Sequence, residues 1–146
     1  MRVIIQRVSR ASVEVEQRIV GEISQGILLL LGVEKNDTEE DAEKLIKKII
    51  NLRIFTDSSG KMNLSLLDIS GELLVISQFT LYGDCRKGRR PSFSKAAGAE
   101  LGKELYNYFL YKARSAVEVV EAGVFGADMQ VSLVNDGPVT FVIDSN

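Results

Sequence analysis

The sequence predicts a single α+β domain, residues 1–146, with a mostly antiparallel, curled and barrel-like β core and two main helices outside it. Short segments with the alternating or uninterrupted apolar pattern of strands recur in both halves of the chain, about eight in all. Two longer segments have the apolar period of amphipathic helices. No repeat, low-complexity stretch or linker divides the chain, and 146 residues suffice for one domain with a substantial core.

Residues 1–33 are expected to form strands. A period of two, typical of a half-buried strand, runs through Ala11, Val13 and Val15. The uninterrupted apolar run at residues 27–33 is typical of a strand at the centre of a sheet, where both faces are covered.

Residues 38–51 are expected to form an amphipathic helix that lies on the sheet. Thr38 and Asp41 resemble a capping box at its start. One apolar stripe follows, made by Ala42, Leu45, Ile46 and Ile49. After the helix we expect a strand at residues 52–56 and an irregular segment at residues 61–70.

The second predicted helix covers residues 95–113. Gly98 and Gly102 weaken it by roughly 1 kcal/mol each relative to alanine, which indicates close packing at these positions. Residues 115–121 alternate and predict a further strand.

The C-terminal segment predicts two more strands, residues 129–134 and 139–143. The residues between them are Asn135, Asp136, Gly137 and Pro138. Asn-Asp-Gly favours a hairpin turn, and Gly-Pro is most often a simple turn dipeptide.

Composition limits the chemistry that the chain can perform. There is no histidine, which excludes Ser-His-Asp and Cys-His nucleophile systems and every zinc site that needs histidine. The single cysteine, Cys85, permits no intrachain disulfide, and without a histidine partner we do not favour it as a catalytic thiol. Asp128, Asp136 and Asp144 are possible oxygen ligands, but their spacing matches no calcium loop. We therefore expect no metal and no cofactor.

Charge and hydropathy point to a cytoplasmic protein. The chain is 45% apolar and 26% charged, with a formal net charge of −2, so no global positive field indicates nucleic-acid binding. The N-terminus lacks the apolar core of a signal peptide. The longest apolar run is far too short to cross a bilayer, so we expect no membrane association.

The stretch at residues 73–82 has the clearest change of character in the chain. Four apolar residues predict a buried strand, and Ser77, Gln78 and Thr80 then bring two hydroxyls and an amide to its end. A buried polar group without a partner costs ~1–3 kcal/mol, so these groups need partners, and a substrate is one candidate. The alternative is a strand that surfaces into a turn at Gly83.

A cationic segment follows at residues 83–93, punctuated by glycine. Its cations are Arg86, Lys87, Arg89 and Arg90. One interpretation is a solvated charged loop, and the other is a loop that contacts phosphates of a nucleic acid. Arg7 lies near the end of the first strand, and its simplest interpretation is a solvated or edge-paired arginine without a functional role.

Two motifs together resemble one known family. They are Ser77, Gln78, Phe79 and Thr80, followed near the C-terminus by Asn135, Asp136, Gly137, Pro138, Val139 and Thr140. In this order and in a chain of this length they are similar to the D-aminoacyl-tRNA deacylases. The segments at residues 1–7, 86–93 and 123–129 resemble that family too, so the likeness covers essentially the whole chain.

The resemblance implies a homodimer that hydrolyses the ester bond of D-aminoacyl-tRNA at subunit-interface sites without a cofactor. If L-residues are rejected by steric exclusion, glycine, which has no side chain, is expected to pass, so glycyl-tRNA should be hydrolysed too. It implies a catalytic stretch formed by Ser77, Gln78, Phe79 and Thr80. It implies chiral selection by a cis Gly-Pro segment of the partner subunit, comprising Gly137, Pro138, Val139 and Thr140. Arg7 and Met129 would support the site, and Arg86, Lys87, Arg89 and Arg90 would contact the tRNA acceptor end.

The missing histidine shapes the expected mechanism. Ser77 or Thr80 as a nucleophile would need a nearby base, and none is apparent in the motif. We therefore expect backbone N–H groups near Phe79 and Thr80 to form an oxyanion hole, while the 2′-hydroxyl of the tRNA assists water. The rival hypotheses are a non-catalytic tRNA-binding dimer and a purely structural dimer.

Overall fold

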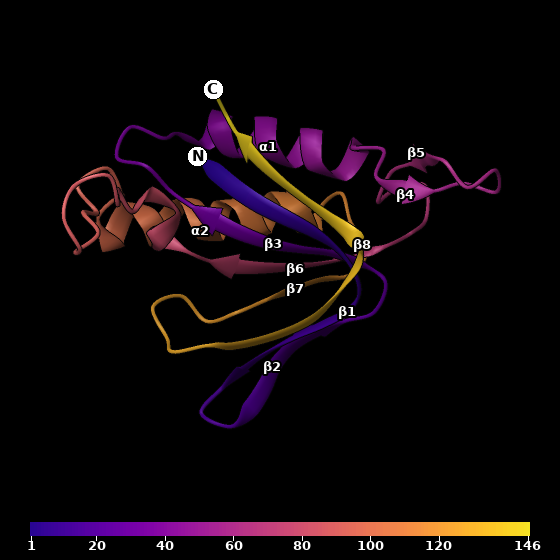
Figure 1. Ribbon diagram of the computed structural model, residues 1–146, viewed down its shortest axis with the longest axis horizontal. Coiled ribbons are helices and arrows are strands. Elements are labelled where there is room, and N and C mark those ends of the chain that lie inside the picture. The colour runs from indigo at the N-terminus through magenta and orange to yellow at the C-terminus, as the bar shows by residue number, and fades with distance from the viewer.

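A curled sheet with two helices on one face builds the protein, as the sequence predicts (Figure 1). The computed structural model describes residues 1–146. In chain order the elements are β1 (Arg2–Val15), β2 (Arg18–Ile23), β3 (Gly26–Gly32), α1 (Glu39–Asn51), β4 (Phe55–Thr56), β5 (Met62–Leu64), β6 (Glu72–Ser77), the 3₁₀ helix η1 (Phe79–Tyr82), α2 (Ala99–Arg114), β7 (Val120–Ala122) and β8 (Gln130–Asp144).

The main sheet is mixed and has the strand order β2-β1-β3-β6-β7, with β8 paired to β1. The long strand β1 pairs antiparallel with β3 through its first half, with β2 through its second half, and with β8 along its other edge. At the other end, β6 lies parallel to both β3 and β7. The expected antiparallel pairs are therefore present, and the parallel strands at the centre explain the uninterrupted apolar runs of β3 and β6.

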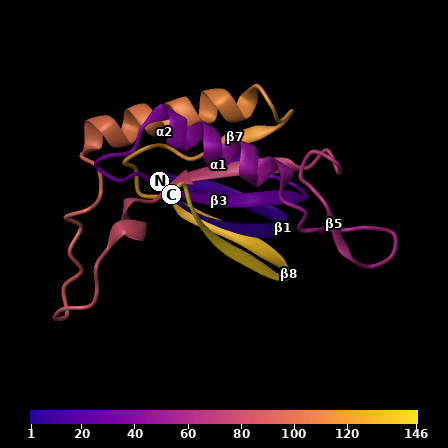
Figure 2. The same ribbon diagram turned by 90° about the horizontal axis from the view of Figure 1, so that it is seen from above.

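The sheet curls until β2 approaches β7. A Cβ atom at Gly21 would lie 3.0 Å from the carbonyl oxygen of Ala122, so glycine is needed for this close approach. Seven buried apolar residues fill the inside of the curl, whereas a larger cluster of 25 buried residues fills the space between the sheet and the helices. Figure 2 shows α1 and α2 side by side on one face, with β8 away from them.

The first predicted helix is confirmed. In α1 the Asp41 carboxylate accepts a hydrogen bond of 2.9 Å from the backbone N–H of Thr38, which satisfies a donor at the helix start. All four residues of the predicted apolar stripe are buried. The strand after it is shorter than predicted, because only Phe55 and Thr56 pair with β5, a short strand within the segment expected to be irregular.

The second helix starts later than predicted, at Ala99. The residues before it are held along the end of β3, where the backbone N–H of Ala97 donates to the oxygen of Val33 at 2.9 Å. Gly102 is buried and faces Phe125, whose ring would lie 3.4 Å from a Cβ there, an ordinary van der Waals contact, and Gly98 faces open space, so neither glycine shows the expected close approach. The strand predicted at residues 115–121 is reduced to β7, because the chain turns tightly after α2.

The predicted hairpin at residues 135–138 is wrong. β8 continues through these residues as one strand paired to β1, and the register shifts there. Gln6 faces Thr140 and Val8 faces Asn135, so residues 136–139 lie opposite Arg7 alone. Asn-Asp-Gly-Pro thus forms a bulge, because β1 offers a continuous partner on both sides of the irregular residues.

No helix in the chain is long and apolar enough to cross a membrane. No group of three or more acidic or cysteine side chains is placed to hold a metal ion.

Candidate active site

The predicted catalytic stretch lies where β6 ends. Residues 73–76 are buried between β3 and β7, and the backbone N–H of Gln78 donates to the oxygen of Leu31 at 2.8 Å, which extends the pairing with β3 by one residue. The chain then turns into η1. The backbone N–H groups of Phe79 and Thr80 open this helical turn, where the first N–H groups have no acceptor within the helix.

A cavity of about 590 Å³ adjoins this turn. Ser77, Gln78 and Phe79 form one border, and Met129, the predicted supporting residue, lies on another. The remaining wall comes from β3, the start of α2 and the loop before β8, through Leu31, Val33, Ala97, Gly98, Ala99, Gly102, Tyr106, Phe125, Gly126, Ala127, Asp128 and Val131, with Ile76 from β6. A cavity of this volume, mostly apolar with a few polar groups, is typical of a small-molecule site.

The side chains that line the cavity include one phenol, that of Tyr106, and one carboxylate, that of Asp128, but no histidine or lysine. Burial raises the pKa of Tyr106 to about 12, and its hydroxyl donates to the oxygen of Val75 at 2.9 Å, so Tyr106 is a neutral structural donor near pH 7. Asp128 is exposed. The backbone N–H of Phe79, which borders the cavity, and that of Thr80 beside it open η1, and donors of this kind can stabilise a developing oxyanion.

Thr80 is exposed and does not border the cavity. Its hydroxyl oxygen accepts a hydrogen bond from the side-chain amide of Gln78. Phe79 is 58% exposed, and its ring meets the ring of Phe93 edge to face with centroids 5.0 Å apart. Phe93 thus ties the cationic loop to the mouth of the cavity.

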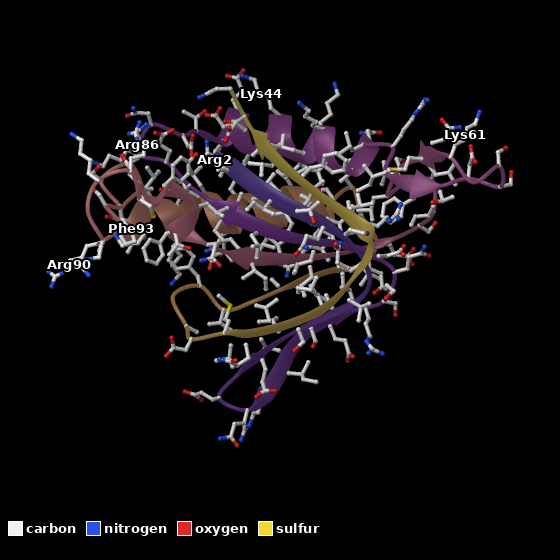
Figure 3. The ribbon with its side chains drawn as sticks, viewed as in Figure 1. Arg2, Lys44, Lys61, Arg86, Arg90 and Phe93 are labelled. Atoms are coloured by element: carbon white, nitrogen blue, oxygen red, sulfur yellow. The ribbon has the colours of Figure 1, made fainter.

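The four predicted tRNA-contacting cations lie on an exposed loop closed by a bridge between Asp84 and Ser92. Arg86 forms an ion pair, because its guanidinium lies 2.6 Å from the Asp84 carboxylate. The guanidinium holds the pKa of that carboxyl well below its usual range. The other three cations form no ion pair. Figure 3 shows Arg86, Arg90 and Phe93 at the same end of the molecule.

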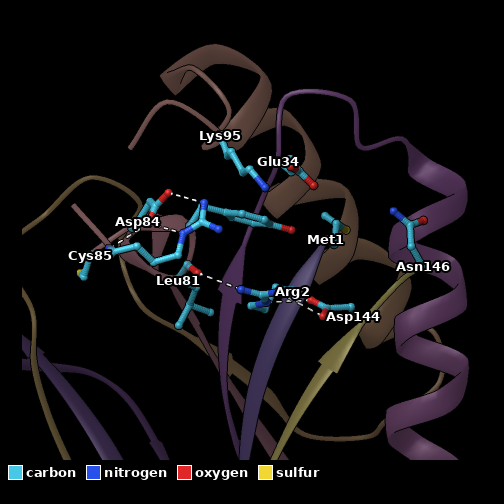
Figure 4. A pocket seen from close by; sticks show the side chains of 12 residues that line it. Met1, Arg2, Glu34, Leu81, Asp84, Cys85, Lys95, Asp144 and Asn146 are labelled. Carbon is cyan, nitrogen blue, oxygen red and sulfur yellow. Dashed lines mark hydrogen bonds and ion pairs between the residues drawn. The ribbon is translucent and has the colours of Figure 1, made fainter. Parts of the chain in front are cut away.

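A second, charged cavity of about 460 Å³ borders the far end of η1 (Figure 4). Here Arg2 pairs with Asp144 at 2.7 Å and donates to the oxygen of Leu81 at 3.4 Å, so β1 and β8 anchor the end of η1. Burial, with Asp37 and Glu34 nearby, raises the pKa of Tyr82, whose hydroxyl therefore stays protonated.

The second motif does not reach the cavity of its own chain. None of the residues Gly137, Pro138, Val139 and Thr140 borders it. The Gly137–Pro138 peptide bond is cis, and Gly137 has φ 142°, a conformation that favours glycine. The structure therefore brings together residues 77–79 and Met129, and leaves residues 137–140 elsewhere on the sheet.

Arg7 is buried beneath this segment, at 8% exposure, so its interpretation as a solvated arginine is wrong. Its guanidinium donates to the oxygen of Ile54 at 2.6 Å and to the oxygen of Asp136 at 3.0 Å. These contacts place the Arg7 guanidinium against the residue before Gly137, and its role in supporting the Gly-Pro segment stays a prediction.

Sequence reasoning missed most of the cavity wall. Gly102 and Phe125 were visible only as a helix glycine and as part of a glycine-rich loop. Glycine lets the backbone approach a ligand closely, so Gly98 and Gly102 at the start of α2 are the signal that could have placed this helix beside a cavity.

Comparisons with known proteins agree with the resemblance. A family model described as D-Tyr-tRNA(Tyr) deacylase matches residues 4–144. Proteins named D-aminoacyl-tRNA deacylase from Thermosipho melanesiensis and Clostridium kluyveri are 60% identical over 146 residues and 57% identical over 145 residues. Each alignment covers 99% of this chain and 97% of the relative.

Solved structures show the same fold. One titled "c-Myc DNA Unwinding Element Binding Protein" has a TM-score of 0.95 and 42% identity, with 100% of this chain and 99% of that chain covered. Another, titled as a probable eukaryotic D-amino acid tRNA deacylase, has a TM-score of 0.86 and 20% identity, with 98% of each chain covered. Because the family model matches residues 4–144, nearly the whole of this chain, the chain belongs to the D-Tyr-tRNA(Tyr) deacylase family.

Proposed function

We propose that this chain hydrolyses the ester bond between a D-amino acid, or glycine, and the 3′-terminal adenosine of tRNA, and that it rejects L-aminoacyl-tRNA. The observation that carries the proposal is the cavity beside residues 77–79, with Phe79 on its border and the backbone N–H groups of Phe79 and Thr80 at the start of η1. Its volume suits an aminoacyl-adenosine end, and relatives about 60% identical over the whole chain are named for this activity. A cytoplasmic location, where aminoacyl-tRNA is used, is part of the proposal.

The chemistry follows from the groups that the cavity offers. A water oxygen attacks the ester carbonyl, the amides of Phe79 and Thr80 stabilise the oxyanion, and the bond from the carbonyl carbon to the 3′-oxygen breaks. The proton lost by water reaches the departing 3′-oxygen through the neighbouring 2′-hydroxyl of the tRNA. An oxyanion donor is typically worth ~2.7–4 kcal/mol, and an aminoacyl ester is already activated, so no side-chain base is required.

Chiral selection is assigned to residues 137–140 of a second copy of the chain. Gly137 and Pro138 are exposed on β8, which pairs with β1 along one edge only. β8 also exposes the apolar side chains of Val134, Phe141 and Val142, which supports an interface on this strand. In the homodimer the segment enters the partner's cavity beside residues 77–80.

The selection works by exclusion. D- and L-amino acids differ in where the side chain leaves Cα, so fixed backbone placed where an L side chain must go rejects every L-residue. Carbonyl groups of the same segment hold the α-ammonium group. Glycine has no side chain to exclude and passes, so glycyl-tRNA is hydrolysed as well.

The test is to incubate the protein with D-Tyr-tRNA and L-Tyr-tRNA and to count the amino acid released. Rapid release from D-Tyr-tRNA with none above the spontaneous rate from L-Tyr-tRNA supports the proposal. The second candidate, a non-catalytic tRNA-binding dimer, is favoured by the three free cations of the exposed loop. It predicts salt-dependent binding of both substrates with no release.

The mechanism has its own test. D-Tyr-tRNA that ends in 2′-deoxyadenosine, with the ester on the 3′-oxygen, is expected to lose most of its turnover while it still competes with the normal substrate. Equal turnover of the two substrates would remove the 2′-hydroxyl from the mechanism.

A further inference from the structure

Asn135 opens the bulge of β8, and its side-chain amide makes two hydrogen bonds to backbone oxygens. Nδ2 donates to the oxygen of Arg7 at 2.9 Å and to the oxygen of Val139 at 3.0 Å. The first acceptor is on β1 and the second is at the far end of the bulge. One amide therefore connects the start of the bulge to its end and both to the neighbouring strand.

These bonds replace pairing that the bulge removes. Arg7 has no partner on β8, because residues 136–139 are inserted opposite it. An unpaired backbone carbonyl in a sheet would cost ~1–3 kcal/mol if buried. A carboxamide NH₂ has two donor hydrogens and satisfies two carbonyls from one position, which neither a carboxylate nor a hydroxyl does.

The same segment is held from below by Arg7. Its guanidinium binds the oxygen of Asp136 at 3.0 Å and the oxygen of Ile54 at 2.6 Å, with the Asp136 carboxylate 3.3 Å away. Asn135 fixes the two ends of the bulge and Arg7 fixes its first residue. Gly137 and Pro138, between these points, remain exposed.

We propose that Asn135 is a positioning residue for chiral selection, setting where Gly137 and Pro138 stand when they meet the partner's cavity. This inference rests on the proposed function and deepens it. Asn135 does not touch substrate and takes no part in ester cleavage. Its effect is on discrimination, because a segment free to shift no longer blocks the space that an L side chain needs.

The experiment compares hydrolysis of D-Tyr-tRNA and L-Tyr-tRNA by Asn135→Ala, Asn135→Asp and Asn135→Ser. Removing both hydrogen bonds in Asn135→Ala is expected to lower the D-to-L ratio of kcat/KM by roughly tenfold or more. Asn135→Asp is expected to lower it at least as far, because a carboxylate would face two carbonyl oxygens. Asn135→Ser keeps one short donor and is expected to fall between Asn135→Ala and the unchanged protein. The kcat for D-Tyr-tRNA is expected to change less than the ratio, because residues 77–80 are unaltered.

Asn51→Ala is the matched control. Asn51 also donates its amide to a backbone oxygen, that of Lys47 at 2.8 Å, but on the exposed end of α1. This variant is expected to keep the full D-to-L ratio, so a general loss of one amide hydrogen bond cannot explain an effect at Asn135.

The outcomes separate this inference from the proposed function. If the unchanged protein shows no preference for D-Tyr-tRNA, the proposed function fails. If that preference is present and the folded Asn135 variants retain it, Asn135 does not position the selecting segment. Failure of all three variants to fold would also overturn the inference, since the amide would then serve folding and not placement.

Discussion

The cavity beside η1 and the bulge of β8 are both formed by residues of a single chain. Only the cavity is a hollow, whereas the bulge lies at the surface. The cavity has walls from several elements, with Ser77 and Phe79 on its border. The bulge is held from inside by Arg7 and Asn135, yet its tip, Gly137, is exposed. The comparison teaches that one region has the enclosed shape of a small-molecule site, while the other is a fixed backbone shape presented outward, suited to contact with a second chain.

The largest expected effect comes from Gly137→Ala, which breaks the shape of the bulge. Gly137 has φ 142°, and a Cβ atom there would lie 2.7 Å from the backbone nitrogen of Val139 and 3.3 Å from Nη2 of Arg7. The backbone must move, and with it the carbonyl groups proposed to hold the α-ammonium group of the substrate, whose misplacement by about 1 Å can cost on the order of 100-fold in kcat/KM. We expect at least this loss for D-Tyr-tRNA in a steady-state release assay.

Gly60→Ala is the control for this substitution. Gly60 also has a positive φ, 78°, but nothing lies within 4 Å of the added Cβ. It should cost about 1 kcal/mol in unfolding free energy with kcat/KM unchanged. Equal kcat/KM for Gly137→Ala and the unchanged protein would show that the bulge has no role in the reaction.

Arg7→Lys tests the bulge from its buried side, because it weakens the hydrogen bonds beneath the bulge and leaves Gly137 and Pro138 unchanged. The Arg7 guanidinium bonds two backbone oxygens from a buried position, and one ammonium group does not reproduce that planar fork. We expect the free energy of unfolding to fall by about 1–3 kcal/mol and L-Tyr-tRNA hydrolysis to rise. Chemical denaturation and the release assay measure the two effects.

Arg18→Lys, on the exposed start of β2, serves as the control and should change neither quantity. If Arg7→Lys lowered stability and left the rejection of L-Tyr-tRNA intact, Arg7 would support the fold and not the selection.

A smaller effect is expected on the cavity side from the loop cations. Replacing Lys87, Arg89 and Arg90 with alanine removes three unpaired charges near Phe93. The slope of log affinity for tRNA against log salt should become shallower by about 0.7–0.9 for each lost phosphate contact. A triple variant on α1, at Lys44, Lys47 and Lys48, carries the same charge change. If both triple variants changed the slope equally, the loop would have no special contact with tRNA.

The sequence predicts the elements beside the cavity better than it predicts the bulge, for a physical reason. The strand before Ser77 and the helix α1 follow from local apolar period, which each segment carries by itself. The bulge does not, because Asn-Asp-Gly favours a hairpin unless a continuous strand such as β1 pairs with the residues on both sides. Arg7 shows the same limit, since its burial depends on Ile54 and Asp136, both distant in sequence.

The residues of the cavity wall could not be predicted from local sequence patterns either. Gly102 is informative only once Phe125 is known to lie against it, and the two meet through the packing of α2 on the loop before β8. The motif resemblance supplied Ser77 and Met129 as site residues, and the fold brings both to one cavity. Tertiary packing, which no short window of sequence contains, supplied the rest.

The smallest expected effect, and the one that decides how the cavity works, is that of Thr80→Ala. The Thr80 hydroxyl accepts a hydrogen bond from Gln78 and does not border the cavity, whereas its backbone N–H lies in the first turn of η1. Alanine keeps that N–H, so kcat for D-Tyr-tRNA should fall by less than about threefold, because each oxyanion donor remains in place. Thr80→Ser, which keeps a hydroxyl, should behave in the same way.

If Thr80 were instead a covalent nucleophile, Thr80→Ala would lose activity by orders of magnitude while Thr80→Ser kept part of it. Single-turnover release measured for both variants beside the unchanged protein distinguishes the two mechanisms, and a folded but inactive Thr80→Ala would contradict the backbone mechanism.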